Sequence, residues 1–253
     1  IYAGGYEDVG DAAIIVITAG ANQKPNETRL DLVQKNAKIM TDVVTQIKEQ
    51  EYKGILLIVS NPVDIMTQVA MEVSGFPEHR VFGSGTVLDS ARLRYHLGQH
   101  LGVDSRSVHA FVIGEHGDSE IAAWSSANVS GVPLNSFCEM RGHFNHEGNT
   151  ESIEEQVKNS AYEIIAKKDA TYYGIAMVVK RICQAIVRDE KSIFPISLRM
   201  HGEYALEDVV LSMPAIVGAR GIETTIPISL DEKEVSRLHE SAEMLRETRK
   251  EIR

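Results

Sequence analysis

One histidine is set apart by its neighbours. His116 lies in the stretch FVIGEHGDSE, between two glycines and directly after an apolar run. Glycines on both sides allow a sharp turn and the close approach of a ligand, and an imidazole gives and takes a proton near neutral pH. Such a base needs a carboxylate to fix its tautomer and stabilise its charged form. The stretch predicts an acid–base histidine; the alternative is a structural or surface histidine.

The partner carboxylate is expected to come from elsewhere in the chain. Glu115 and Asp118 are too near in sequence to aim well at the ring, so the distant Asp89, in GSGTVLDSARLR, is the better candidate. Arg92 follows three residues later on the same face of a predicted helix, and its guanidinium could grip a carboxylate with two parallel hydrogen bonds. The alternatives are a first-turn acid for Asp89 and a surface salt bridge for Arg92.

Two further stretches follow strand-like runs. TAGANQKPNETRLDL, at 18–32, is a polar loop that could close over a substrate and bring Gln23 and Arg29 to it. SNPVD, at 60–64, offers Asn61 to a cofactor amide or a substrate oxygen. Loops that leave the carboxyl ends of parallel strands form the binding crevice of such sheets. The alternatives are an ordinary connecting loop for residues 18–32 and a helix cap for Asn61.

The elements that position these residues change in character along the chain. Apolar runs rich in β-branched residues predict buried parallel strands at 12–19, 55–60 and 81–85, with helices at 29–50 and 62–74 between them. After residue 85 we expect a helix at 88–101, strand-like runs at 108–114 and 121–129, a polar loop at 141–152, a helical segment at 152–189, three antiparallel strands (SIFPISLRMHG, VVLSMPAIVGARG, TTIPISL) and a terminal helix. The sequence predicts α/β architecture over 1–85 and α+β architecture over 86–253.

Composition limits the class of protein. The 253 residues are 43% hydrophobic and 25% charged, with a net charge of −10, so the acidic surface argues against a nucleic-acid partner. No apolar run reaches about 18 residues, which predicts no membrane span. Cys138 and Cys183 stand far apart and in no ligand pattern. We therefore expect free thiols in a reducing cytoplasm and no metal.

Five stretches in this order, spread over essentially the whole chain, resemble the L-lactate/malate dehydrogenase family, and its bacterial lactate-specific members most. They are ITAGANQKPNETRLDLVQKN, IVSNPVD, GSGTVLDSARLR, VHAFVIGEHGDSE and ATYYGIA. The resemblance implies an incomplete Rossmann-type parallel sheet followed by an α+β substrate domain. It also implies NAD-dependent interconversion of pyruvate and L-lactate, as in glycolysis and fermentation.

The same resemblance implies roles for the site residues. His116 would be the proton donor and acceptor, and Asp89 would orient it. Arg92 would bind the substrate carboxylate, Arg29 would polarise the carbonyl, and Thr171 would line the substrate pocket. The implied cofactor-binding residues are Tyr6, Gly20, Ala21, Val59, Ser60 and Asn61, of which the last also contacts substrate.

Gln23 distinguishes substrates within the family. Malate dehydrogenases usually carry an arginine at the matching position, where it pairs with the second carboxylate of oxaloacetate. A neutral glutamine leaves room for the methyl group of pyruvate, and a buried, unpaired carboxylate is costly. The resemblance therefore favours pyruvate over oxaloacetate.

Arg94 and His109 match positions that bind fructose 1,6-bisphosphate across a subunit interface in many bacterial members of the family. The same pair also occurs in members without such regulation, so allosteric activation stays open. The resemblance also implies a homotetramer.

The glycine-rich start of the family pattern is absent from these 253 residues, which contain no GxGxxG. By the family's layout about 60 residues, two βαβ units, would precede Ile1. If the molecule begins at Ile1, we expect no useful NAD binding. The alternatives to a lactate enzyme are a malate or other 2-hydroxyacid dehydrogenase, or an inactive truncated remnant that binds a partner.

Overall fold

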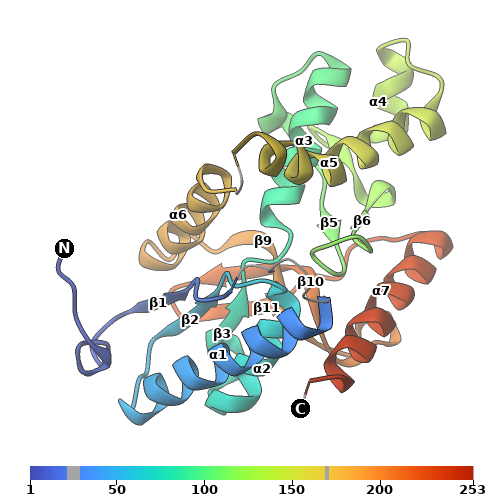
Figure 1. The fold of residues 1–253 in the computed structure, drawn as a ribbon. Coiled ribbons are helices and arrows are strands. Elements are labelled where there is room, and N and C mark those ends of the chain that lie inside the picture. The colour runs from blue at the N-terminus through green and yellow to red at the C-terminus, as the bar shows by residue number, and fades with distance from the viewer. Residues whose placement is uncertain (22–28, 169–170, 253) are drawn as a thin grey trace.

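A computed structural model describes residues 1–21, 29–168 and 171–252 of the chain. The main sheet contains β1 (Ile14–Ile17), β2 (Ile55–Ile58), β3 (Val81–Gly83), β9 (Ser192–His201), β10 (Glu207–Gly218) and β11 (Gly221–Thr225), in that order. The first three strands are parallel, as predicted, and the last three are antiparallel. Figure 1 shows this sheet in the lower half of the molecule.

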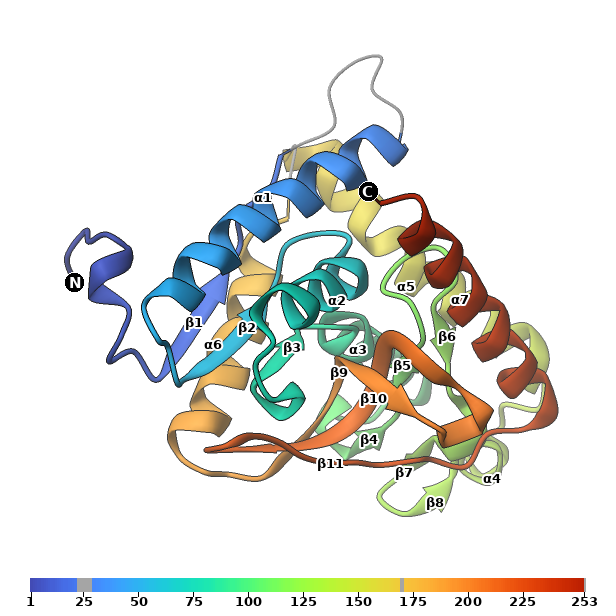
Figure 2. The same ribbon diagram turned by 90° about the horizontal axis from the view of Figure 1, so that it is seen from below.

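Helices cover both faces of the sheet. α1 (Arg29–Glu49) and α2 (Val63–Ser74) lie below it in Figure 1, whereas α6 (Tyr173–Val187) lies above. The view from below in Figure 2 shows α1 and α2 side by side in front of the strands. β2 is buried along its whole length, as expected of a strand covered on both faces.

Most of the remaining elements form a second lobe with its own small core. They are α3 (Val87–Leu101), β4 (Val108–His109), β5 (Val112–Ile113), β6 (Ile121–Ala122), β7 (Asn128–Val129), β8 (Val132–Pro133), α4 (Leu134–Met140) and α5 (His146–Lys168). This lobe stands above the sheet in Figure 1, and α3 connects the two. The predicted domain division at residue 85 stays a prediction, because the sheet continues across it where Gly83 pairs with Ser197.

Several predicted elements were wrong in detail. The run at 108–114 divides into β4 and β5, which belong to different sheets, and the run at 121–129 is interrupted by a 3-10 turn at Trp124–Ser126. α5 begins at His146, inside the predicted polar loop, and the long helical segment is two helices. β11 begins three residues before the predicted run TTIPISL and ends five residues before the end of that run. A continuous apolar run does not show where one strand ends and the next begins, or with which strand each one pairs.

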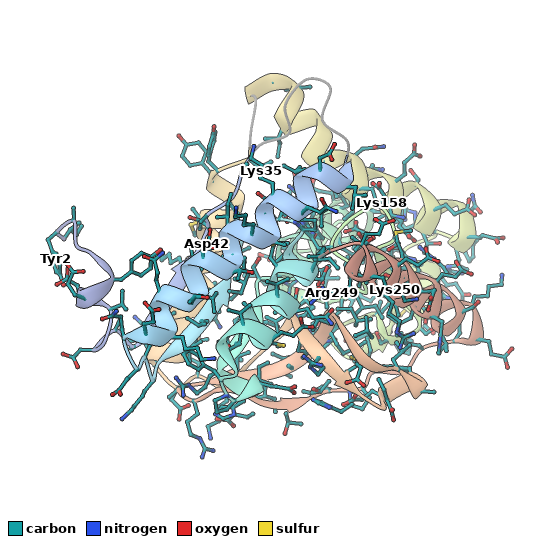
Figure 3. The ribbon with its side chains drawn as sticks, turned by 60° about the horizontal axis from the view of Figure 1, so that its bottom comes forward. Tyr2, Lys35, Asp42, Lys158, Arg249 and Lys250 are labelled. Carbon is teal, nitrogen blue, oxygen red and sulfur yellow. The ribbon has the colours of Figure 1, made fainter. Side chains whose placement is uncertain are left out.

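The terminal helix α7 (Glu232–Lys250) closes the molecule against α2 and β10. It begins at a capping box in which Asp231 Oδ1 accepts from the Glu234 N–H at 2.8 Å, while the Glu234 carboxylate accepts from the Asp231 N–H. At its other end Arg249, labelled in Figure 3, forms an ion pair with Glu72 of α2. None of the described helices has the length and apolar character needed to cross a bilayer.

Candidate active site

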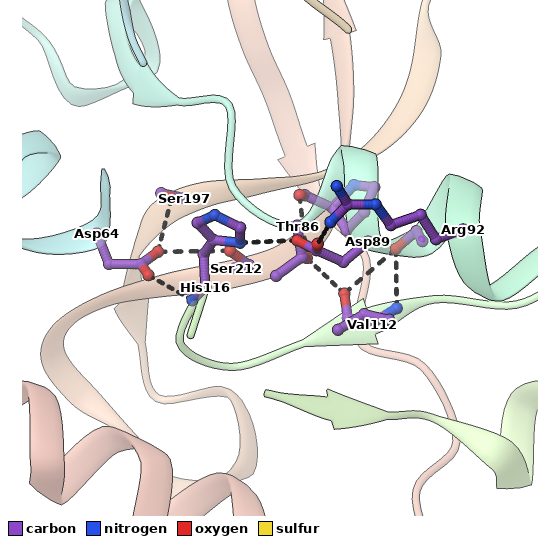
Figure 4. A network of polar contacts seen from close by, with 10 residues as sticks. Asp64, Thr86, Asp89, Arg92, Val112, His116, Ser197 and Ser212 are labelled. Atoms are coloured by element: carbon purple, nitrogen blue, oxygen red, sulfur yellow. Dashed lines mark hydrogen bonds and ion pairs between the residues drawn. The ribbon is translucent and has the colours of Figure 1, made fainter. Parts of the chain in front are cut away.

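His116 and Asp89 meet between the two lobes, as predicted. His116 lies in the loop after β5 and Asp89 lies in the first turn of α3, and Nδ1 of the ring is 2.7 Å from Oδ2 of the carboxylate. Figure 4 shows the ring facing the carboxylate across the space between the loop and the helix. Asp89 is buried and the His116 side chain is 30% exposed, so the ring retains access to solvent.

Arg92 contacts the second oxygen of the same carboxylate. Its Nη1 donates to Oδ1 of Asp89 at 3.0 Å, and its side chain is only 14% exposed. This bond uses one of the five N–H donors that a guanidinium carries. Asp89 therefore lies between an imidazole and a guanidinium, one on each oxygen.

The charges around His116 and Asp89 shift their protonation. Burial alone would lower the pKa of the His116 imidazole, but the Asp89 carboxylate, with Asp64 and Glu120, outweighs burial and raises the pKa to about 9. Burial alone would raise the pKa of Asp89, but His116 and Arg92 together hold it below its usual range. Near neutral pH the pair is an imidazolium and a carboxylate.

The loop that carries His116 is tied to β10. Gly114 has a φ of +84°, a value that favours glycine. Its N–H donates to the main-chain oxygen of Ser212 at 2.9 Å, and its own oxygen accepts from the Ser212 N–H at 2.8 Å. The turn into His116 is therefore fixed to the sheet, and this accounts for the glycine on that side of the histidine.

Asp64 supports this loop and was missed by the sequence analysis. This fully buried residue of α2 accepts a hydrogen bond from the His116 N–H at 2.7 Å and another from Ser197 Oγ at 2.6 Å (Figure 4). Ser212 Oγ lies 3.4 Å from the same carboxylate. Burial raises the pKa of Asp64 to about 6. Its position two residues after the Asn-Pro turn of SNPVD is the one signal in the sequence.

Hydrogen bonds also fix α3 to β5. Thr86 Oγ1 donates to the main-chain oxygen of Val112 at 2.5 Å, and Ser90 Oγ accepts from the Val112 N–H at 2.8 Å. All three residues are buried. These bonds set the position of the helix turn that carries Asp89 relative to the loop that follows β5.

The predicted binding crevice after β1 and β2 is held together by Asn36, a buried residue of α1. Its Oδ1 accepts from the Ala21 N–H at 2.8 Å, and its Nδ2 donates to the main-chain oxygen of Asn61 at 3.0 Å. Ser60 Oγ donates to the main-chain oxygen of Ala19 at 2.6 Å. Two loops therefore lie side by side at the carboxyl ends of adjacent parallel strands, where such sheets bind nucleotides. Asn36 was also missed, although its polar side chain interrupts an apolar helix face.

The residues predicted to contact NAD lie on both loops, namely Gly20, Ala21, Val59, Ser60 and Asn61. Gly20 and Asn61 are exposed, and a Cβ at Gly20 would come no closer than 3.6 Å to Asn36. The main chain here is thus open to a ligand, and these residues fit one side of a dinucleotide. Tyr6 lies in a short 3-10 helix, Tyr6–Asp8, and packs against the main core.

The other predicted site residues have more limited descriptions. Gln23 lies outside the described residues. Arg29 is the first residue of α1, and its side chain also lies outside them. Thr171 is half-buried and precedes α6 by two residues. Their predicted roles stay predictions.

Arg94 and His109 lie on different elements. Arg94, on α3, lines a cavity of about 720 Å³ between α3, α6 and β9, to which Arg181 and Lys191 also contribute. Its Nε donates to the Ser90 main-chain oxygen at 3.2 Å. His109 is an exposed residue of β4. The predicted bisphosphate site remains a prediction.

Glu120 is a third carboxyl group beside His116. It is 5% exposed, and one side-chain ligand atom from each of Glu120, Asp89 and His116 lies within 4.8 Å of the others. Burial and the Asp89 carboxylate raise the pKa of Glu120 to about 8. Sequence reasoning gave Glu120 no role, since an acid directly before a short strand is ordinary. The expectation that the chain binds no metal stays a prediction.

Comparison with known families and solved structures agrees with this geometry. Residues 1–83 match the NAD binding domain of lactate/malate dehydrogenase, and residues 86–253 match the alpha/beta C-terminal domain of the same family. The minor L-lactate dehydrogenase of Enterococcus mundtii, solved in its ligands-bound form, superposes with a TM-score of 0.95 at 42% identity. The alignment covers 99% of this chain and 79% of that one.

Curated relatives give the same result. The L-lactate dehydrogenase of Acetivibrio thermocellus is 48% identical over 98% of this chain and 78% of its own length. That of Streptococcus pneumoniae is 49% identical over 97% of this chain and 74% of its own length. With both domains matched along its length, the chain belongs to the lactate/malate dehydrogenase family, whose first domain binds NAD.

Proposed function

We propose that this chain is an L-lactate dehydrogenase, which interconverts pyruvate and L-lactate with NAD(H). The observation that carries the proposal is the contact between His116 Nδ1 and Asp89 Oδ2 at 2.7 Å, with Arg92 on the other carboxylate oxygen. The names of the relatives support the same activity.

The proton chemistry follows from this contact. Because Nδ1 faces Asp89, Nε2 is the ring nitrogen left for a substrate. NAD(H), held along Gly20, Ala21 and Asn61, would supply the hydride equivalent for pyruvate reduction. His116 gives its Nε2 proton to the carbonyl oxygen, which becomes the hydroxyl of lactate. A pKa of about 9 keeps the imidazole charged and ready to donate at neutral pH. In the reverse direction the neutral ring accepts that proton.

The substrate contacts are proposed residue by residue. Arg92 would use its remaining donors for the substrate carboxylate, and its position beside Asp89 supports this role. Arg29 would approach the carbonyl oxygen from the start of α1. Thr171 and Asn61, which precede α6 and α2, would line the pocket. Gln23 would select pyruvate by leaving a second carboxylate unpaired.

Assembly and location belong to the same proposal. Exposed apolar side chains on and next to α6, including Tyr173 and Met177, support a homotetramer built through this surface. Arg94, with His109, would bind fructose 1,6-bisphosphate between subunits. Two free cysteines support a cytoplasmic protein.

The test is NADH oxidation by the full-length protein with pyruvate or oxaloacetate, with and without fructose 1,6-bisphosphate. We expect kcat/KM for pyruvate to exceed that for oxaloacetate by at least about 100-fold. A preference for oxaloacetate would identify a malate dehydrogenase instead. An activity unchanged by the bisphosphate would remove the allosteric part of the proposal.

A further inference from the structure

Glu120 is a buried acid at the catalytic centre to which the proton chemistry assigns no task. It is the residue directly before β6, and its main-chain oxygen accepts from Arg237 Nη2 of α7 at 3.4 Å. With 5% exposure and ligand atoms within 4.8 Å of those of Asp89 and His116, its carboxyl group is buried beside theirs. This cluster of Asp89, His116 and Glu120 therefore holds two carboxyl groups before a substrate brings a third.

Charged groups face Glu120 from every element around it. They are Asp89 and Arg92 on α3, His116 on its loop, Lys158 and its partner Glu154 on α5, and Arg237 on α7. Two of the nearby cations are already shared, because Arg92 and His116 each bind an oxygen of Asp89. An ionised Glu120 would thus compete with Asp89 for the same cations.

Burial decides the charge of Glu120 near neutral pH. Removal from water and the Asp89 carboxylate both oppose its ionisation, and they outweigh the opposing effect of His116, Lys158 and Arg92. Its pKa is raised to about 8, so at pH 7 the group is mostly a neutral acid. At pH 9 it is mostly a carboxylate.

We propose that Glu120 controls substrate entry: the carboxylate of a 2-oxo acid binds Arg92 only while Glu120 is protonated. The inference rests on the proposed function, since it concerns the substrate of that site. An ionised Glu120 and a substrate carboxylate would place two negative charges beside a cation already bound to Asp89. Because Glu120 is almost fully buried, water screens such a pair poorly and it is disfavoured. Loss of the Glu120 proton therefore raises KM.

The first test compares KM for pyruvate at pH 7 and pH 9 in the full-length enzyme. If only the protonated form binds, ionisation of Glu120 raises KM about tenfold over this range, and partial loss of the His116 proton adds about twofold. The wild type should thus show a rise of about twentyfold. In Glu120→Gln only the His116 proton is lost, and because the Glu120 charge helps to raise the pKa of His116, KM should rise about two- to fivefold. Glu155→Gln, an exposed position on α5, is the matched control and should follow the wild type.

The split between KM and kcat separates this role from a structural one. At saturating pyruvate, kcat should follow the protonation of His116 in both proteins, because Glu120 acts on binding. A Glu120→Gln enzyme whose KM rises as steeply as that of the wild type overturns the inference, as does a wild-type KM that is flat from pH 7 to 9. A wild type that does not reduce pyruvate overturns the proposed function, and this inference with it.

A second measurement needs no variant. Oxamate, an unreactive carboxylate analogue of pyruvate, is titrated into the enzyme–NADH complex at pH 8 in buffers of different ionisation enthalpy. Because His116 is already mostly protonated there, binding should take up about half a proton, which goes to Glu120. Uptake close to 0.1 proton, the share left to His116, would overturn the proposal even if Glu120→Gln failed to fold.

Discussion

The carboxylate of Asp89 contacts both the side chain proposed to transfer the proton and the side chain proposed to bind the substrate. One oxygen holds the imidazole of His116 and the other holds the guanidinium of Arg92. A change at Asp89 should therefore alter proton transfer and substrate binding together. Burial makes both contacts stronger than they would be on the surface.

Replacing Asp89 by Asn removes the charge that raises the pKa of His116. That pKa should fall from about 9 toward its ordinary value, 6.5. The protonated ring, which pyruvate reduction requires, is then present only at lower pH. At pH 8 we expect kcat/KM for pyruvate to fall at least about thirtyfold, with a smaller loss at pH 6, as measured by a pH–rate profile. The control is Asp42→Asn, an exposed position on α1 (Figure 3). Equal losses at the two pH values would contradict the role of charge.

Replacing Arg92 by Lys keeps the charge and removes the planar fork. We expect KM for pyruvate to rise about 100-fold, because a lysine cannot bind Asp89 and a substrate carboxylate in two directions at once. Steady-state kinetics provides the measurement. Arg106→Lys is a suitable comparison, since Arg106 also pairs with an aspartate, Asp104, but is 89% exposed. A small change at Arg92, similar to that at Arg106, would show that its contact with Asp89 is merely structural.

Residue type and context were enough to predict that the side chains of His116, Asp89 and Arg92 meet. Asp64 and Asn36 could not be predicted in the same way, because each becomes important only through burial and through main-chain groups from distant segments. A single sequence shows that a polar residue is present on a helix. It does not show which loops the folded chain brings to that residue.

At the scale of elements, the turn between β3 and α3 decides where Asp89 lies. Gly85 in this turn has a φ of +51°, and a Cβ there would lie 2.7 Å from the main-chain oxygen of Pro195 and from the N of Ser197. These neighbours belong to the backbone of β9 and cannot give way cheaply. Close packing of the turn on β9 thus sets the start of α3.

Gly85→Ala should therefore destabilise the protein by about 3 kcal/mol or more, through both strain and the clash with β9. Urea unfolding followed by circular dichroism measures the change. Gly10→Ala is the control, because a Cβ at Gly10 meets nothing within 4 Å and its φ is not positive. Equal stability of the two variants would show that the turn adapts.

The apolar runs predicted the parallel strands and the helices around them well, since each of these elements has one regular period. The second lobe was harder to predict. Its strands are two residues long, and β4 and β5 belong to different sheets. Such strands are too short to show a repeating pattern of apolar and polar residues. Turn geometry and tertiary pairing determine such segments.

For the whole molecule, the buried acids of the site predict how stability depends on pH. Asp64 and Glu120 have pKa values raised to about 6 and 8. A group whose pKa is higher in the folded than in the unfolded protein contributes stability. This contribution is fully present below the pKa of the unfolded state and is lost as the pH rises through the pKa of the folded state. His116 contributes in the same direction up to about pH 9. Asp89, whose pKa is lowered, contributes stability above its unfolded value that is lost only in acid.

The free energy of unfolding should therefore fall between pH 5 and pH 8.5, and Glu120→Gln should make this decline less steep. Chemical denaturation at a series of pH values gives both slopes. Glu155→Gln again serves as the control, because it is exposed. Identical slopes in Glu120→Gln and the wild type would mean that Glu120 titrates alike in the folded and unfolded states.

The pairing of Gly83 with Ser197 limits how hybrid proteins can be made from this chain and another family member. Ser197 both extends the sheet from β3 and donates to Asp64, which in turn holds the loop of His116. The two regions that match separate domain patterns therefore share one strand junction, which is linked through Asp64 to the His116 loop. A hybrid protein joined at residue 85 should be active only if both parent proteins have the same pairing of Gly83 with Ser197. We therefore expect residues on the two sides of residue 85 to change together in evolution.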